Sequence, residues 1–289
     1  MSKKQMKPWA PAFLFILAFA FSAELAAGET YVVAIDVGHT KASPGAISAS
    51  GRPEYEFNRE IARQLEERLK ETNKDGGATI NPFIISSERS MALPSRTKIA
   101  TSKNADLFVS IHHDSAQDQY LEERVVNGKE ERFTNEFSGY SVFVSRKNPR
   151  YAESFDVAQR IGRAMQTNGF KFARHHHEQI AGENRPFADE AAGVYAFDDL
   201  VVLKTATMPA VLVECGVIVN PKEEEALQTK ERQAAITSAI VRGIRDHFAH
   251  APATPRAQKG GVTIETTSPA PTRYPKPGAT LAPALSRDN

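Results

Sequence analysis

The sequence predicts an α/β fold, a single domain with a mostly parallel central sheet flanked by helices on both faces. Short apolar and β-branched runs recur along the chain, and amphipathic helical stretches lie between them. Strands that alternate with helices of this length indicate βαβ units, whose strands run parallel. The hydrophobic fraction of 41% and the charged fraction of 25% are those of a globular protein that can bury a core.

The first half of the domain begins with a strand at residues 31–36, which ends at Gly38 and His39. The helix that follows has one apolar stripe, made of Phe57, Ile61, Leu65 and Leu69. We predict a weaker strand at 79–86 and place it near a sheet edge, because Pro82 cannot donate a backbone hydrogen bond. A helix at 91–103, a buried strand at 106–111 and a strand at 139–145 complete this half.

The second half continues the alternation. We predict a helix at 154–168, ended by the Asn168-Gly169 pair, and short strands at Val201–Lys204 and at 210–214. The last helix has an apolar stripe made of Ile236, Ile240, Ile244 and Phe248. The predicted domain therefore spans residues 28–250.

The first 27 residues have the features of a secretory signal peptide. Lys3, Lys4 and Lys7 precede an apolar run at 9–23, and small residues suited to signal peptidase follow at Ala26 and Ala27. The run is shorter than the roughly 20 residues of a spanning helix, so we expect a cleaved signal and no stable membrane span afterwards. An uncleaved anchor is the alternative.

The charge balance excludes one class of partner. Without residues 1–27, 36 − 3 = 33 basic and 35 − 1 = 34 acidic residues remain, a net charge of −1. No basic field is left to attract nucleic acid, so we expect no nucleic-acid partner.

Two segments interrupt the alternation of strands and helices. Residues 251–289 are rich in Pro, Thr and Ala and poor in large apolar residues, which predicts a flexible tail. Residues 115–137 are long and densely charged, and a loop of this length inside a domain is usually functional or disordered.

Metal-binding residue types follow two of the predicted strands. His39 comes just after the first strand, where Gly38 permits a tight turn, and His112 ends the strand at 106–111. Open α/β sheets place their sites at this carboxyl edge, and Glu54 opens the helix between the two strands. Two imidazoles and one carboxylate are the ligand set of a catalytic zinc, although each residue taken alone has an ordinary structural explanation.

Glu214 and Cys215 follow the apolar strand at 210–213. A carboxylate at this position is poorly solvated, and it has a role there as the general base beside zinc-bound water. Cys215 is the lone cysteine, so an intrachain disulfide is impossible. A thiol nucleophile is the alternative, and we favour a small buried packing residue.

These stretches resemble the zinc-dependent N-acetylmuramoyl-L-alanine amidases of the amidase-3 family. The matching motifs are IDVGH (35–39), SPGAISASGRPE (43–54), EIARQLEERL (60–69), ADLFVSIHHDS (105–115) and MPAVLVECGVIVNPKEE (208–224). The resemblance covers residues 31 to about 248. Arg89 and Arg96 fall in the weaker segment that usually precedes the second histidine.

The resemblance implies that His39, Glu54 and His112 bind Zn²⁺ and that Glu214 is the catalytic base. Glu56 is the rival of Glu54, but the family's glutamate lies seven positions before the helix isoleucine, here Ile61. His113 is the rival of His112, but the family's histidine directly follows Ser-Ile, and a strand turns alternate side chains to opposite faces.

The chain departs from the family pattern in two ways. Asp114 stands where asparagine is common, and the distance from His112 to Glu214 is longer than in compact members. The extra length lies in 115–137 and in 175–199. Some larger members carry an inserted helix that covers the zinc until a partner removes it. We take His175–His177 as a solvated loop, with a metal site as the alternative.

The expected activity is zinc-dependent hydrolysis of the amide between N-acetylmuramic acid and L-alanine in peptidoglycan, in cell-wall turnover or daughter-cell separation. The alternatives are a zinc peptidase acting within the stem peptide and a catalytically silent wall-binding regulator. The expected location is periplasmic, or otherwise secreted. Peptidoglycan is the expected partner, and an activator protein would be a second one if residues 115–137 cover the cleft.

Overall fold

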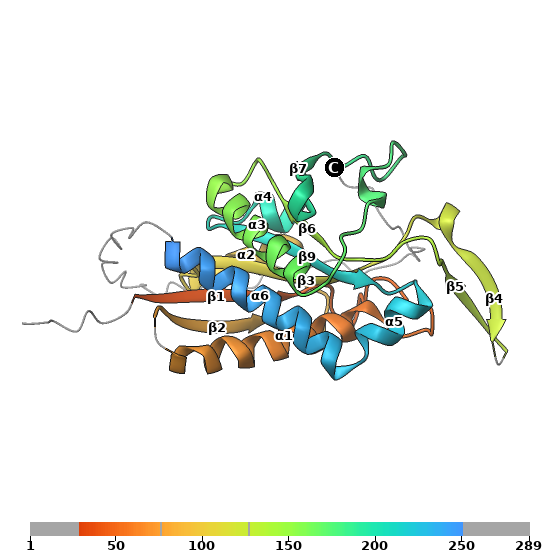
Figure 1. Cartoon of the computed structure of the whole chain (residues 1–289), viewed down its shortest axis with the longest axis horizontal. Coiled ribbons are helices and arrows are strands. Elements are labelled where there is room, and N and C mark those ends of the chain that lie inside the picture. The colour runs from red at the N-terminus through yellow and green to blue at the C-terminus, as the bar shows by residue number, and fades with distance from the viewer. Residues whose placement is uncertain (1–28, 76, 127, 251–289) are drawn as a thin grey trace, which may run out of the picture.

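The computed structural model describes residues 29–75, 77–126 and 128–250. The main sheet in this part of the chain has seven strands in the order β2-β1-β3-β9-β6-β8-β7 (Figure 1). Their bounds are β1 Thr30–Val37, β2 Thr79–Ile85, β3 Leu107–Asp114, β6 Ser141–Val144, β7 Phe187–Asp189, β8 Val194–Ala196 and β9 Ala210–Val217. Strands β2, β1, β3 and β9 are parallel, β6 runs antiparallel to β9, and β7 runs antiparallel to β8. The sheet is thus mostly parallel, as predicted.

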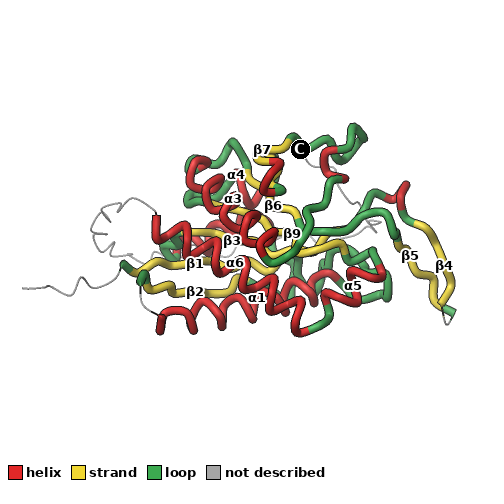
Figure 2. Tube along the Cα trace, viewed as in Figure 1, coloured by secondary structure: helices red, strands yellow, loops and turns green. Residues whose placement is uncertain are grey.

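Helices cover both faces of the sheet, which confirms the predicted fold class (Figure 2). On one face lie α1 (Glu54–Glu71), α3 (Tyr151–Thr167) and α6 (Lys230–His250). On the other lie α2 (Leu93–Ser102) and α4 (Val201–Lys204). Helix α5 (Pro221–Leu227) follows β9, and short 3-10 turns lie at Thr72–Asp75, Asp118–Tyr120, His175–His177 and Glu190–Ala192.

The alternation of side chains along β1 and β3 explains where the site can form. Val33, Ile35 and Val37 of β1 pack with the α1, α3 and α6 side, and Ala34 packs on the α2 and α4 side. Strand β3 alternates in the same way, with Val109 on the first side and Phe108 on the second. The polar residues at the carboxyl ends of both strands continue this alternation, which fixes the face that each one occupies.

Two further predictions about strands have different outcomes. Strand β2 lies at an edge of the sheet, as its Pro82 predicts. Val201–Lys204 is not a strand but the short helix α4, whose Val202 and Leu203 pack under the sheet. Four apolar residues have too little length to show a period, and burial beneath the sheet favours the helical turn.

The charged segment 115–137 is also not a structureless loop. It contains an antiparallel hairpin of β4 (Glu122–Val126) and β5 (Lys129–Phe133), which extends from one end of the molecule (Figure 1). At its base, Tyr120 and Leu121 pack on a small cluster with Phe137. The prediction of a loop failed because charged residues on both faces hide the strand pattern.

The predicted leader, residues 1–27, and the predicted tail, residues 251–289, lie outside the described residues. Among the residues that are described, no helix combines the length and apolar character needed to cross a membrane.

Candidate metal centre

His39 is positioned by the turn that follows β1. The residue with left-handed backbone is His39 itself, at φ 64°, and not Gly38 as the tight-turn argument predicts. Gly38 is needed for a different reason, since a Cβ atom there would lie 2.4 Å from His112 Nε2. The absence of a side chain at Gly38 lets the His112 ring lie directly against the backbone of this turn.

Glu54 is the first residue of α1 and is buried, at 4% exposure. Its Oε2 lies 2.9 Å from His39 Nε2, and its Oε1 lies 3.0 Å from His112 Nδ1. The Asn58 side-chain amide donates to Oε1 at 3.0 Å, and the Ala46 backbone N–H donates to Oε2 at 3.1 Å. Both carboxylate oxygens are therefore held between the two imidazoles.

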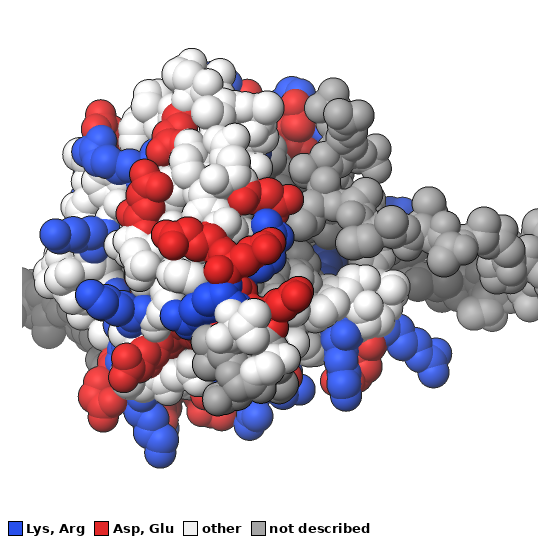
Figure 3. Space-filling view, turned by 90° about the vertical axis from the view of Figure 1, so that its right-hand side faces the viewer, with Lys and Arg blue, Asp and Glu red and all other residues white. Residues whose placement is uncertain are grey.

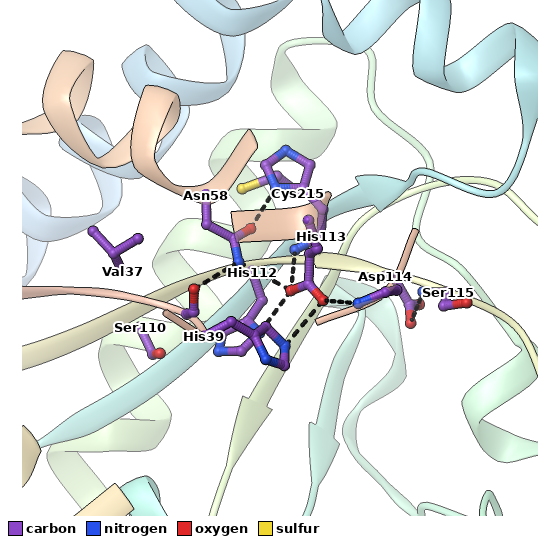
Figure 4. A network of polar contacts seen from close by, with 12 residues as sticks. Val37, His39, Asn58, Ser110, His112, His113, Asp114, Ser115 and Cys215 are labelled. Carbon is purple, nitrogen blue, oxygen red and sulfur yellow. Dashed lines mark hydrogen bonds and ion pairs between the residues drawn. The ribbon is translucent and has the colours of Figure 1, made fainter. Parts of the chain in front are cut away.

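His39, Glu54 and His112 form one compact group, with one ligand atom from each within 4.8 Å of the others. Figure 4 shows His39 and His112 turned toward each other at the strand ends. The donor set fits zinc, which binds imidazole nitrogen and carboxylate oxygen and leaves a fourth position open at catalytic sites. The partial exposure of the two histidines gives that position access to solvent.

The charges in this group favour the ionised carboxylate. Burial, the largest influence on Glu54, raises its pKa, but hydrogen bonds and charge from His112 and His39 together bring the pKa well below its usual value. Burial lowers the pKa of His39, and the Glu54 carboxylate outweighs it, so that the pKa of His39 is raised. A metal cation bound to His39 would face the same ionised Glu54 carboxylate that a proton on His39 faces.

A buried ion pair beneath the site was not predicted. Arg96 of α2 donates to Asp36 Oδ1 at 2.6 Å and to the Val37 carbonyl at 2.6 Å, and it also bonds the His39 carbonyl. Ser110 donates to the other oxygen of Asp36 at 2.8 Å. Arg96 thus ties the turn that carries His39 to α2. The aspartate inside the IDVGH motif was the available signal, since a buried carboxylate needs a cationic partner.

The two rival residues occupy other environments. His113 is buried on the opposite face from His112, where its Nδ1 lies 2.8 Å from Asn58 Oδ1 (Figure 4). Burial lowers the pKa of His113 to about 3, so the ring is neutral. Glu56 is exposed and pairs with Arg52 at 3.2 Å. Asn58 connects His113 to the metal-ligating group, since its side-chain NH₂ donates to both Glu54 and the Gly38 carbonyl.

Glu214 lies beside this group on the neighbouring strand. It is the register partner of His112 across β3 and β9, which places both side chains on the same face. Its Oε2 is buried and has no hydrogen-bond partner among the described residues. Burial raises the pKa of Glu214 well above its ordinary value, and the charges of Asp114 and Glu54 raise it further.

Cys215 points the other way, into the core cluster beneath α1, α3 and α6. It is 1% exposed, and burial raises the pKa of its thiol well above the ordinary value. A reactive cysteine needs a lowered pKa and access to substrate. The environment of Cys215 is that of a packing residue, as predicted.

The β4–β5 hairpin contains four glutamates, Glu122, Glu123, Glu130 and Glu131. In the described structure none of them joins the group of His39, Glu54 and His112. Glu131 pairs with Arg124 at 2.9 Å and Glu123 lies 3.8 Å from Arg132, so these charges are balanced within the hairpin. Glu122 and Glu130 are exposed. On the end of the molecule that carries the hairpin, acidic and basic side chains lie interspersed (Figure 3).

The prediction that His175–His177 is a solvated loop is wrong for its first two residues. His175 and His176 are buried, and their rings pack on Phe137 and Phe143. Their Nε2 atoms lie 3.0 and 2.9 Å from Asp114 Oδ2. Three consecutive histidines read as polar in a sequence, and only the fold shows that a buried carboxylate lies opposite them. His177 is exposed, as predicted.

Two imidazoles and a carboxylate at the carboxyl edge of a parallel sheet, beside a further carboxylate, are the arrangement of metal-dependent hydrolases. The chain belongs to the N-acetylmuramoyl-L-alanine amidase family Amidase_3, whose family model matches residues 33–246. This match confirms the resemblance seen in the motifs.

Similar proteins carry the same family name. A probable N-acetylmuramoyl-L-alanine amidase AmiB of Haemophilus influenzae is 26% identical over 251 residues, which cover 80% of this chain and 55% of that protein. The chain thus spans about half of that relative. The amidase AmiA of Salmonella typhimurium is 27% identical over 245 residues, covering 76% of this chain and 77% of AmiA.

The fold has solved counterparts. The crystal structure of an N-acetylmuramoyl-L-alanine amidase from Clostridium difficile 630 superposes with a TM-score of 0.59 at 21% identity. The match covers 78% of this chain and all of that one. The likeness supports the single α/β domain.

Proposed function

We propose that this protein is a zinc-dependent N-acetylmuramoyl-L-alanine amidase, which hydrolyses the amide between N-acetylmuramic acid and the first L-alanine of the peptidoglycan stem. The observation that carries the proposal is the group of His39, Glu54 and His112 with Glu214 as the register partner of His112. The family membership supplies the substrate class. We assign His39, Glu54 and His112 as zinc ligands and Glu214 as the catalytic base.

Zinc, when bound, polarises the substrate carbonyl and lowers the pKa of water toward neutrality. The chain's own residues supply the proton transfer and the positioning. Glu214 takes the proton of the attacking water on its carboxylate and passes it to the nitrogen of L-alanine as the C–N bond breaks. Arg96 and Asn58 act through other residues, because they hold the His39 turn and the Glu54 carboxylate in place.

Replacing the base separates catalysis from metal binding. Glu214→Gln should retain fold and zinc but lose about 100-fold or more of the activity, as expected when general acid–base help is removed. Its neighbour is the matched control, since Cys215→Ala removes a buried thiol from the opposite face. Activity is measured as release of stem peptide from purified sacculi. An inactive Cys215→Ala protein together with an active Glu214→Gln protein would indicate a thiol hydrolase instead.

The products on sacculi distinguish the proposed activity from its alternatives. An amidase releases intact stem peptides and leaves glycan strands without peptide, which mass spectrometry detects directly. A peptidase acting within the stem would leave L-alanine attached to the glycan. A silent wall-binding regulator would release neither product, and the presence of all four assigned residues argues against that function.

The setting of the activity is part of the proposal. We place the enzyme in the periplasm, with secretion as the alternative, because residues 1–27 carry a signal-peptide pattern. Its role there is cell-wall turnover or daughter-cell separation. An activator protein remains a prediction that depends on residues 115–137 covering the cleft, and the hairpin glutamates give it no support because none joins the metal-ligating group.

A further inference from the structure

A second group of metal-ligating side chains lies on the same strand as His112. Asp114 of β3 faces His175 and His176, and one ligand atom from each lies within 4.8 Å of the other two. The side chains of Asp114, His175 and His176 are 12%, 2% and 8% exposed. We call these three residues the Asp114 cluster. Nothing in the proposed hydrolysis uses it.

The atoms that converge in the Asp114 cluster are not satisfied by hydrogen bonds. His175 Nε2 and His176 Nε2 lie 3.0 and 2.9 Å from Asp114 Oδ2. Even so, none of the three atoms has a hydrogen-bond partner of acceptable geometry among the described residues. Buried polar atoms without partners are rare in proteins and call for an explanation. A cation bound between the three atoms would satisfy all of them.

The surroundings of the cluster are those of a built site. Asp114 Oδ1 is occupied by the Ser115 backbone N–H at 2.8 Å, which leaves Oδ2 for the histidines. On the far side of its ring, His176 Nδ1 lies 3.0 Å from Glu183 Oε2. Gln117 in turn donates to Glu183 Oε1 at 2.8 Å. A carboxylate on the second nitrogen of a histidine is the arrangement that orients metal-ligating imidazoles.

We propose that the Asp114 cluster binds a second Zn²⁺ ion. Two imidazoles and a carboxylate repeat the donor set of the first group, and the contacts of 2.9–3.0 Å repeat its spacing. Ligand atoms around a tetrahedral zinc lie roughly 3.3 Å apart. The histidine nitrogens would therefore move only a few tenths of an ångström away from Asp114 Oδ2 when zinc binds. Hard cations such as Mg²⁺ prefer all-oxygen sites and fit poorly here.

The ion would fasten the segment 174–186 to the sheet. The segment has little regular structure beyond the turn at His175–His177, and the described contacts of His175 and His176 join it to the end of β3. Arg174, the first residue of the segment, is exposed. Zinc at this position would stabilise the segment against local opening without touching the group at His112.

Metal content of purified, tag-free protein tests the proposal. After removal of metal by a chelator and reloading with zinc, the wild-type protein should hold two equivalents. His176→Gln and His112→Ala should each hold one, and reloading with Mg²⁺ should leave no equivalent after desalting. His177→Ala is the matched control, because this exposed neighbour lies outside the cluster, and it should hold two.

Trypsin cleavage provides a second readout that does not require His176→Gln to fold. In the His112→Ala protein, zinc at ten times its dissociation constant should slow cleavage after Arg174 about tenfold, because binding opposes opening by that factor. One zinc equivalent in the wild type that is lost in His112→Ala would overturn the proposal, as would two equivalents retained in His176→Gln. Two equivalents retained in His112→Ala would instead contradict the proposed catalytic site.

Discussion

Two glutamates two positions apart in α1 provide a matched test of the ligand assignment. Glu54 is buried between His39 and His112, whereas Glu56 is exposed and pairs with Arg52. Glu54→Gln should lose zinc and activity, and Glu56→Gln should change both only slightly, since an exposed pair is worth less than about 1 kcal/mol. Zinc content and sacculus digestion are the measurements. Loss of zinc in Glu56→Gln alone would contradict the proposed alignment of the helix start.

A pair of glycines tests whether the close packing around Glu54 matters. Gly45 has φ +80°, and a Cβ there would lie 2.4 Å from Glu54 Oε2. Gly51 has φ +91°, and its Cβ would meet open space. Alanine at either position should cost about 1–2 kcal/mol of folding stability through backbone strain. Only Gly45→Ala should also weaken zinc affinity, measured by competition with a chelator. Equal weakening in both variants would assign the effect to strain.

The residues of the site were largely predictable because each one follows an apolar strand or opens a helix. The family resemblance favoured Glu54 over Glu56 and His112 over His113, and the structure brings Glu54 and His112 together with His39. Their roles as zinc ligands stay a prediction. The Asp36–Arg96 pair and the buried state of His175 and His176 could not be predicted. Both depend on partners about 60 positions away in the chain, and no local pattern reports such pairs.

At the scale of elements, the β4–β5 hairpin is open to a direct test. Replacing residues 122–133 by a short Gly/Ser linker keeps Tyr120 and Leu121, which pack at the base of the hairpin. Because the hairpin glutamates are exposed or paired with its own arginines, we expect no rise in basal activity on sacculi. Weaker glycan binding would indicate a role as a cleft wall. Higher basal activity would support autoinhibition and contradict this expectation.

Long elements with a strong period were predicted well, and short or charged ones were not. Helices α1, α3 and α6 show clear apolar stripes, and β1, β3 and β9 are apolar runs buried on both faces. The prediction of a strand at Val201–Lys204 was wrong because four residues do not distinguish a strand from a helix turn. Strands β7 and β8 were missed because each has three residues and gains its stability from the sheet it joins.

At the scale of the whole molecule, the core clusters of the described structure lie between Tyr31 and Phe248. A protein of residues 29–250 should therefore keep the melting temperature and zinc content of the full chain. A control ending at residue 229 lacks α6, whose Ile236, Ile240 and Ile244 are buried, and it should fail to fold. Circular dichroism melting and metal analysis compare the three proteins. A large loss of stability in 29–250 would give the terminal segments a structural role.

The position of β9 has a consequence for how the protein folds. This strand is the last in the described part of the chain, yet it lies in the middle of the sheet between β3 and β6. Until about residue 217 has been made, β3 and β6 both present open edges, which are prone to pair with other chains. Pairing β3 with β9 also closes a loop of about 100 residues, so folding should be slow compared with that of proteins rich in local contacts. The step that fills the middle of the sheet is also the step that brings Glu214 beside His112.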